Sequence, residues 1–255
     1  MANERPWLRF YGGVPANLDY PKVTLYEAVA ASAQRQPDAI AWDFLDTTCT
    51  YRDFVAAIDK CANALAALGL KAGERLLISM PTSPQGVLAF YAANKLGVLP
   101  AMIHPLSTPP EIERYLNASR ARTALTLDAF YDRFAAVKPR LALERIVLAR
   151  IPEYLSPVKK LGFWLTKGRK IPKVPADARV HWWSRLMRQP HSPAPRADAT
   201  TDDPAAIMFS GGTTGELKGI VLSNHNLIAE GMQAAAWGGM ARGDSILACL
   251  PIFHG

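Results

Sequence analysis

The sequence predicts an α/β fold in which a mainly parallel β-sheet is flanked by helices. Helical and strand patterns alternate between residues 51 and 148, and this alternation is typical of right-handed βαβ units. The 255 residues are 49% hydrophobic, so the chain can bury one large core or the cores of two intertwined subdomains.

The first predicted element is an amphipathic helix. Apolar residues recur at helical spacing from Tyr51 to Leu68, and Gly69 follows as a stop signal. The elements expected after it alternate in type: a strand over 75–80, a helix over 83–96, a strand over 98–103, a helix over 109–118, a strand over 123–127, a helix over 128–137 and a strand over 145–148.

Residues 155–175 interrupt this alternation. The segment is basic and aromatic: it has no acidic residue, and apolar side chains such as Phe163 and Trp164 are interleaved with Lys159, Lys160, Lys167, Arg169, Lys170 and Lys173. Two interpretations stay open. In the first, the segment contacts an anionic membrane surface. In the second, it is a solvent-exposed surface segment whose aromatic residues pack on the domain.

A proline-rich stretch divides the chain. Residues 189–204 contain four prolines together with Ser, Thr and Asp, and we expect an extended connector there. The predicted organisation is an α/β subdomain over 1–188, this connector, and a segment over 205–255. That last segment would hold a loop hairpin, a helix over 226–236 and the start of a second sheet.

The loop of this last segment predicts phosphate binding. It reads Ser-Gly-Gly-Thr-Thr-Gly-Glu-Leu-Lys-Gly over residues 210–219, between the apolar runs 205–209 and 220–222. Glycines let backbone N–H groups turn inward around an anion, hydroxyl groups add donors, and Lys218 adds a mobile positive charge. The spacing is not that of a Walker A loop, because two residues separate Gly215 from Lys218 and a β-like run follows.

This loop resembles the signature loop of the adenylate-forming superfamily, which includes acyl-CoA synthetases, luciferases and peptide-synthetase adenylation domains. The resemblance implies that it closes over the β- and γ-phosphates of ATP while a carboxylate attacks the α-phosphate. Lys218 and Thr214 are then the expected catalytic residues. The nucleotide-binding set is Ser210, Gly211, Gly212, Thr213, Thr214, Gly215 and Lys218, with Ser210 also the candidate closest to Mg²⁺. Leu217 replaces the proline usual in the family, so we expect a looser loop.

Other segments extend the resemblance over most of the chain. Residues 50–54, 71–75 and 85–105 are similar, in this order, to the family's opening motifs. Leu250-Pro251-Ile252-Phe253-His254 resembles the motif whose aromatic residue and histidine lie near the acyl-carboxylate pocket, so Phe253 and His254 are expected there. The alternative for His254 is a structural role, in which neighbouring groups form the hydrogen bonds of its ring.

The resemblance points to fatty-acid CoA ligases of the acyl-CoA synthetase/luciferase-like class, with this chain as the N-terminal part of the large domain. We expect ATP-dependent formation of an acyl-adenylate and then of acyl-CoA, with ATP, Mg²⁺ and CoA as partners. The family's later adenine, ribose, hinge and C-terminal lysine motifs are not found, so the chain is expected to be an inactive fragment. The alternatives are a non-catalytic membrane-surface or phosphate-binding module and an amino-acid-activating domain.

Net charge and cysteine content limit the possible ligands and the cellular location. The net charge is +7, but the basic residues are scattered without a nucleic-acid-binding motif, so phosphate ligands or a membrane surface explain it better. The three cysteines have no metal-ligand spacing and suggest neither a disulfide framework nor zinc. We expect neither a secretory signal nor a membrane-spanning run, so the predicted location is the cytoplasm. Contact with the inner membrane face belongs to the first of the two interpretations of residues 155–175.

Overall fold

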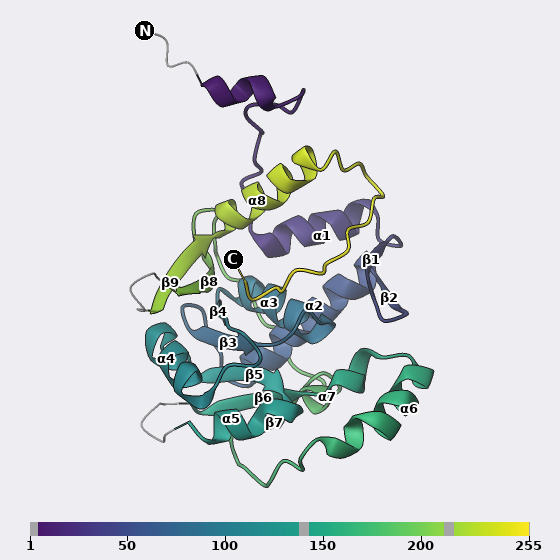
Figure 1. The fold of residues 1–255 in the computed structure, drawn as a ribbon, viewed down its shortest axis with the longest axis vertical. Helices are drawn as coiled ribbons and strands as arrows, with labels where there is room; N and C mark the ends of the chain where they lie inside the picture. The colour runs from purple at the N-terminus through teal and green to yellow at the C-terminus, as the bar shows by residue number, and fades with distance from the viewer. Residues whose placement is uncertain (1–4, 138–142, 212–216, 255) are drawn as a thin grey trace.

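A seven-stranded sheet forms the centre of the molecule in this computed structural model, which describes residues 5–137, 143–211 and 217–254. Its strand order is β7-β6-β5-β3-β4-β8-β9 (Figure 1). Neighbouring strands are parallel except β8 and β9, which pair antiparallel. The bounds are β3 (Arg75–Ser79), β4 (Leu99–Met102), β5 (Thr123–Leu127), β6 (Arg145–Ala149), β7 (Val180–Trp182), β8 (Pro204–Gly211) and β9 (Leu217–Ser223). The predicted α/β class with a mainly parallel sheet is confirmed.

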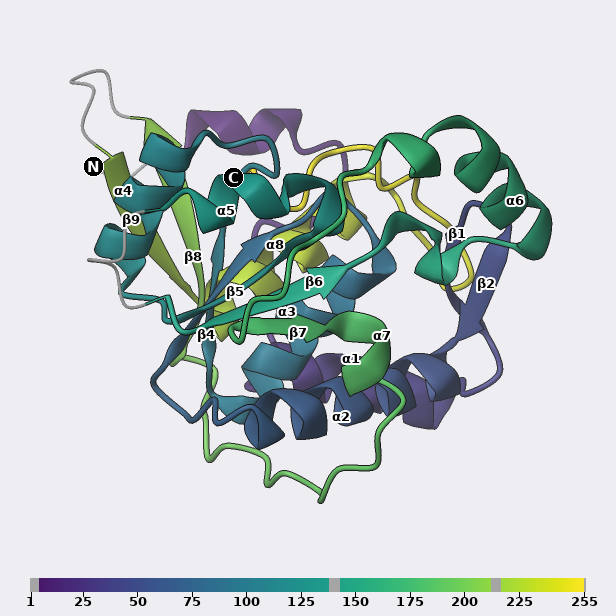
Figure 2. The ribbon, with the colours of Figure 1, turned by 90° about the horizontal axis from the view of Figure 1, so that it is seen from below.

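Helices cover both faces of the sheet (Figure 2). Successive strand residues point to opposite faces, so Leu76 and Ile78 join one core and Leu77 the other. The first core lies under α2 (Tyr51–Ala67) and α3 (Pro84–Leu96), and the second lies under α4 (Pro109–Ser119) and α5 (Tyr131–Ala135). This two-sided burial explains why the central strands are mostly apolar and do not alternate with charged residues.

One helix and two strands close to the N-terminus were not expected. A Thr24–Glu27 capping box starts α1 (Leu25–Arg35), which packs on α2 and α3. Strands β1 (Ile40–Phe44) and β2 (Thr47–Thr50) form a separate antiparallel hairpin. Leu45 and Asp46 turn this hairpin with φ of 51° and 66°, values that glycine or asparagine adopts more readily.

The expected helix over 128–137 is split. A 3₁₀ turn, η2 (Asp128–Phe130), precedes α5, and residues 138–142 lie outside the described part. The basic segment 155–175 contains α6 (Pro157–Thr166) and η4 (Gly168–Lys170), reached through η3 (Ile151–Tyr154). Two further short elements are η1 (Pro6–Phe10) and α7 (Trp183–Leu186).

Residues 187–203, all of them described, contain no helix or strand, in agreement with an extended connector. The segment runs along α2 and α3: Ala194 N donates to Asn63 Oδ1 at 2.8 Å and Ala197 N to Lys95 O at 2.9 Å. Beyond it, β8 and β9 extend the sheet of the preceding residues, and α8 (Asn224–Trp237) follows. The division into domains at 189–204 stays a prediction.

Gly97 shows how tightly this surface is packed. It ends α3 with φ of 67°, and a Cβ there would lie 2.9 Å from the Ala197 Cβ. Only glycine combines this left-handed conformation with such an approach. In the described part of the chain, none of the helices has the length and apolar character that a bilayer span requires.

Candidate phosphate and carboxylate site at the carboxyl edge of the sheet

The candidate residues gather where parallel strands end. Strand β8 runs parallel to β4, with Met208 level with Met102, so the end of β8 lies beside the segment that follows β4. That segment carries His104, and the end of β8 carries Ser210. In open α/β sheets this carboxyl edge is where ligands bind.

The β8–β9 hairpin holds the predicted phosphate-binding residues. Ser210 pairs directly with Lys218, and Gly211 with Leu217. Residues that pair directly across two strands point to the same face, so the Ser210 hydroxyl and the exposed Lys218 ammonium share one side of the hairpin. Gly212, Thr213, Thr214 and Gly215 lie outside the described residues, and their roles stay predictions.

Aromatic packing fixes the base of the hairpin. The Phe209 and Tyr115 rings meet edge to face with centroids 4.7 Å apart, which ties β8 to α4. A Cβ at Gly219, the residue paired with Phe209, would lie 3.4 Å from the Phe209 ring. The strands that carry Ser210 and Lys218 are therefore packed against α4 at this point.

The strand order reverses direction at β3, which only β4 separates from this hairpin. After β3 the chain adds β4 on one side, and it then crosses back to place β5 on the other side of β3. Such a switch point opens a crevice outside the strand ends. The C-terminal residues lie there: the Thr82 hydroxyl donates to Leu250 O at 3.2 Å and accepts from Ile252 N at 3.3 Å.

Phe253 and His254, both predicted to line a carboxylate pocket, take different positions. The Phe253 ring lies edge to face on the His104 ring, with centroids 4.7 Å apart. His254 is exposed, and its backbone N–H donates to Pro251 O.

His104, given no role from the sequence, accepts from Leu106 N at its Nδ1, so the neutral ring carries its proton on Nε2. The sequence feature that could have pointed to His104 is its position directly after a buried strand.

A partly buried polar cluster at the ends of β5 and β6 was also missed. Burial raises the pKa of the Asp128 carboxyl, although Arg150 Nε lies 3.5 Å away and opposes that rise. Burial likewise raises the pKa of Glu153, whose Oε2 accepts from Gln85 Nε2 at 3.3 Å. The Arg150 guanidinium also lies 4.0 Å from the Trp182 ring centroid. Raised carboxyl pKa values at a strand-end crevice are typical of functional sites.

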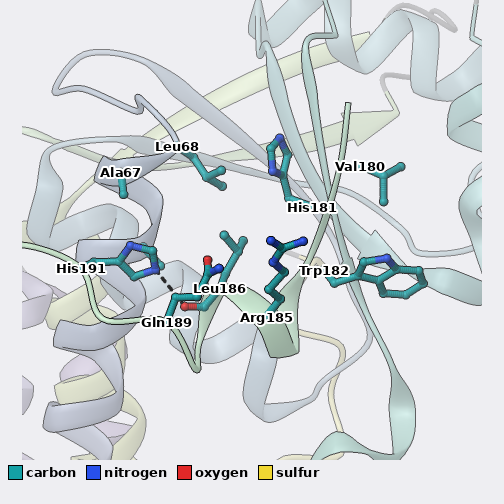
Figure 3. Close-up of a pocket in the computed structure, with 10 residues that line it drawn as sticks. Ala67, Leu68, Val180, His181, Trp182, Arg185, Leu186, Gln189 and His191 are labelled. Carbon is teal, nitrogen blue, oxygen red and sulfur yellow. Dashed lines mark hydrogen bonds between the residues drawn. The ribbon is translucent and has the colours of Figure 1, made fainter. Parts of the chain in front are cut away.

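A cavity of about 360 Å³ lies on the opposite edge of the sheet. Figure 3 shows the side chains that line it. Val180 and His181 at the start of β7, together with Leu68 and Arg185, contribute to its lining. His191 and the Leu186 carbonyl, 2.9 Å apart, form a hydrogen bond at its rim. This cavity belongs to the amino ends of the strands, away from the hairpin. The described residues contain no cluster of three or more His, Cys, Asp and Glu that could hold a metal ion.

The profile of a family described as AMP-binding enzyme matches residues 29–255, which is most of the chain. The chain belongs to the AMP-binding enzyme family. Membership agrees with the glycine-rich sequence between β8 and β9 at the carboxyl edge of a parallel sheet.

The relatives include ligases that act on carboxylic acids. A long-chain-fatty-acid–CoA ligase of Bacillus subtilis (strain 168) is 29% identical over 262 residues, covering 100% of this chain and 46% of the ligase. The 4-coumarate–CoA ligase 2 of Oryza sativa subsp. japonica is 27% identical over 246 residues, covering 93% of this chain and 41% of the ligase. The chain therefore spans under half the length of these relatives.

Solved structures show the same fold. The long-chain-fatty-acid-CoA ligase FadD1 from Archaeoglobus fulgidus has a TM-score of 0.74 at 24% identity, covering 93% of this chain and 44% of that one. The anthranilate CoA ligase AuaEII, solved with anthranoyl-AMP, has a TM-score of 0.68 at 22% identity, covering 87% of this chain and 38% of that one. The match to the N-terminal part of such ligases confirms the predicted fold class.

Proposed function

We propose that this chain supplies the phosphate-binding part of an acid-thiol ligase that activates a fatty acid. The pairing of Ser210 with Lys218 at the carboxyl edge, next to the crevice that holds Phe253, is the observation that carries the proposal. The B. subtilis relative named as a long-chain-fatty-acid–CoA ligase supports the substrate class. In such a protein the reaction would have two steps.

In the first step a carboxylate oxygen of the fatty acid attacks the α-phosphorus of ATP, and the bond to the β-phosphate oxygen breaks. A fatty acid is already ionised near neutral pH, since a carboxyl pKa is about 4 to 5. No base is required, and the protein has to orient the reactants and offset negative charge. In the second step the thiol sulfur of CoA attacks the acyl carbon, AMP leaves, and the thiol proton is lost.

Lys218 would balance the charge that develops on the departing pyrophosphate. The hydroxyls of Ser210, Thr213 and Thr214 and the N–H groups of Gly211, Gly212 and Gly215 would donate to phosphate oxygens. Magnesium bound to ATP keeps phosphate and water oxygens as most of its ligands, so the single hydroxyl of Ser210 fits as one further ligand. Phe253 would form a wall of the carboxylate pocket next to His104, with His254 at its exposed rim.

A location in the cytoplasm is proposed with this function, because ATP and CoA are available there. Contact of residues 155–175 with the inner membrane face is a separate proposal that rests on α6 and not on the hairpin.

Pyrophosphate release tests the proposed reaction in the protein that carries this chain. ATP, Mg²⁺ and CoA would be combined with medium- and long-chain fatty acids, aromatic acids or amino acids. We expect release with fatty acids and formation of the matching acyl-CoA. Release with amino acids alone would instead favour the amino-acid-activating alternative.

A further inference from the structure

Helix α6 has none of its residues buried, although it is rich in apolar side chains. It leaves the body of the molecule through η3 after β6 and lies at the periphery of the fold (Figure 1). A helix of ten residues is marginal in water unless packing stabilises it. The outer face of α6 therefore lacks the protein contact that an apolar helix normally has.

The exposed apolar side chains form one stripe. Val158, Leu161 and Leu165 follow helical spacing of three and four residues, and they are 81%, 59% and 52% exposed. Trp164, which is 54% exposed, widens the stripe on one side. Scattered single apolar residues are ordinary on a surface, but a continuous stripe marks a binding face.

The same helix and the turn after it carry cations. Lys160, Lys167 and Lys170 are exposed, and the Arg169 guanidinium lies 4.3 Å from the Trp164 ring centroid. Residues 155–175 contain no carboxylate that could neutralise them. The charge pattern is complementary to a surface that is anionic and apolar just beneath its charges.

One lysine has a different role. Lys159 Nζ lies 2.6 Å from Asp46 Oδ2 in the turn between β1 and β2. This ion pair joins α6 to the β1–β2 hairpin, whose Leu45 is 49% exposed. The helix is therefore anchored to the body on one side, while its stripe stays open.

We propose that α6 and η4 dock on the surface of an anionic phospholipid bilayer. The apolar stripe enters the boundary between headgroups and acyl chains, Trp164 lies at headgroup depth, and the lysines contact lipid phosphates. A protein partner would need a groove that matches this short stripe, whereas a bilayer accommodates both the stripe and the cations of α6 and η4.

The position of α6 adds a functional consequence that rests on the proposed function. Strand β6 ends at the carboxyl edge of the sheet and continues through η3 into α6, so docking brings this edge close to the bilayer. Long-chain acids partition into bilayers because each buried methylene is favourable. The substrate pocket would then face the phase that holds its substrate.

Vesicle flotation without ATP or fatty acid tests the docking surface separately from catalysis. The probes are neutral phosphatidylcholine vesicles and vesicles in which about a third of the lipid is phosphatidylglycerol. Two variants are compared with the wild type: Leu161→Gln with Leu165→Gln, and Lys160→Gln with Lys167→Gln and Lys170→Gln. A control triple variant, Lys22→Gln with Lys60→Gln and Lys71→Gln, removes the same charge from exposed sites elsewhere.

We expect the wild type and the control variant to float with the anionic vesicles in a salt-sensitive manner. The α6 lysine variant should bind roughly tenfold more weakly or worse, and the leucine variant should lose binding as well. Unchanged thermal midpoints show that the variants fold. Equal binding of the α6 and control lysine variants would overturn the proposal, as would a wild type that does not bind the vesicles. A dimer that depends on α6 and does not bind vesicles would also overturn it.

Discussion

Single residues in this chain are positioned by the strands that carry them. The Ser210–Lys218 pairing follows from the register of two antiparallel strands, and the sequence motif alone predicted that the residues on either side of the loop would converge. The pairing of Phe253 with His104 could not be predicted in this way. The two residues are far apart in sequence, and only the crevice at the switch point brings them together.

Asp177 is expected to couple stability to pH. Its carboxylate accepts from Arg179 Nη2 at 2.8 Å and from the Tyr131 hydroxyl at 2.9 Å. The Arg179 guanidinium in particular holds the pKa of Asp177 well below its ordinary value of 3.8. The stabilisation is therefore complete above that ordinary value and is lost as pH falls through the lower folded pKa.

Replacing Asp177→Asn should lower the free energy of unfolding at pH 7 by about 1–2 kcal/mol, because charge-assisted hydrogen bonds are lost. The difference from the wild type should shrink below about pH 4. Urea unfolding at several pH values measures it, with Asp198→Asn in the exposed connector as the control. A deficit that is as large at pH 3 as at pH 7 would count against this role of the ion pair.

Secondary-structure elements were predictable where apolar residues recur at regular spacing. The strand over 123–127 and the helix that begins at Pro109 are confirmed, because apolar spacing and an N-terminal proline mark them. The β1–β2 hairpin was missed because Leu-Asp is an unusual pair for a turn with positive φ. The expected helix over 226–236 begins two residues earlier, where Ser223 is the N-cap.

Asn224 joins four separate segments and shows how α8 is held. The fully buried side-chain oxygen accepts from Leu25 N at 3.0 Å and from Asn94 Nδ2 at 2.8 Å. Its amide nitrogen donates to Thr200 O at 3.0 Å. Helices α1, α3 and α8 and the segment before β8 therefore meet at one side chain.

Asn224→Ala should reduce the free energy of unfolding by about 2–4 kcal/mol, since buried donors on Leu25 and Asn94 would lose their acceptor. Asn117→Ala, the same change at an exposed position of α4, should cost less than about 0.5 kcal/mol. Chemical denaturation of both variants provides the comparison. Similar losses at the two positions would show that Asn224 does not hold these elements together.

At the scale of the whole molecule, the alternation of helices and strands predicted the class of fold but not its strand order. The position of β8 next to β4 depends on a return across the sheet after a connector that has no regular structure. That return places the β8–β9 hairpin beside β4, one strand from the switch point at β3. The partly buried Asp128 and Glu153 escaped prediction for the same reason, because strand order decides which loop residues meet.

The central claim is that the β8–β9 hairpin binds the phosphates of a nucleotide through Lys218. Calorimetric titration of pyrophosphate and of Mg·ATP into the wild type, Lys218→Ala and the control Lys22→Ala tests it most directly. We predict saturable binding that Lys218→Ala weakens about tenfold or more, because a charge-assisted contact is worth about 1.5–3 kcal/mol. Lys22→Ala should bind like the wild type. Equal affinities for the wild type and Lys218→Ala would contradict the account.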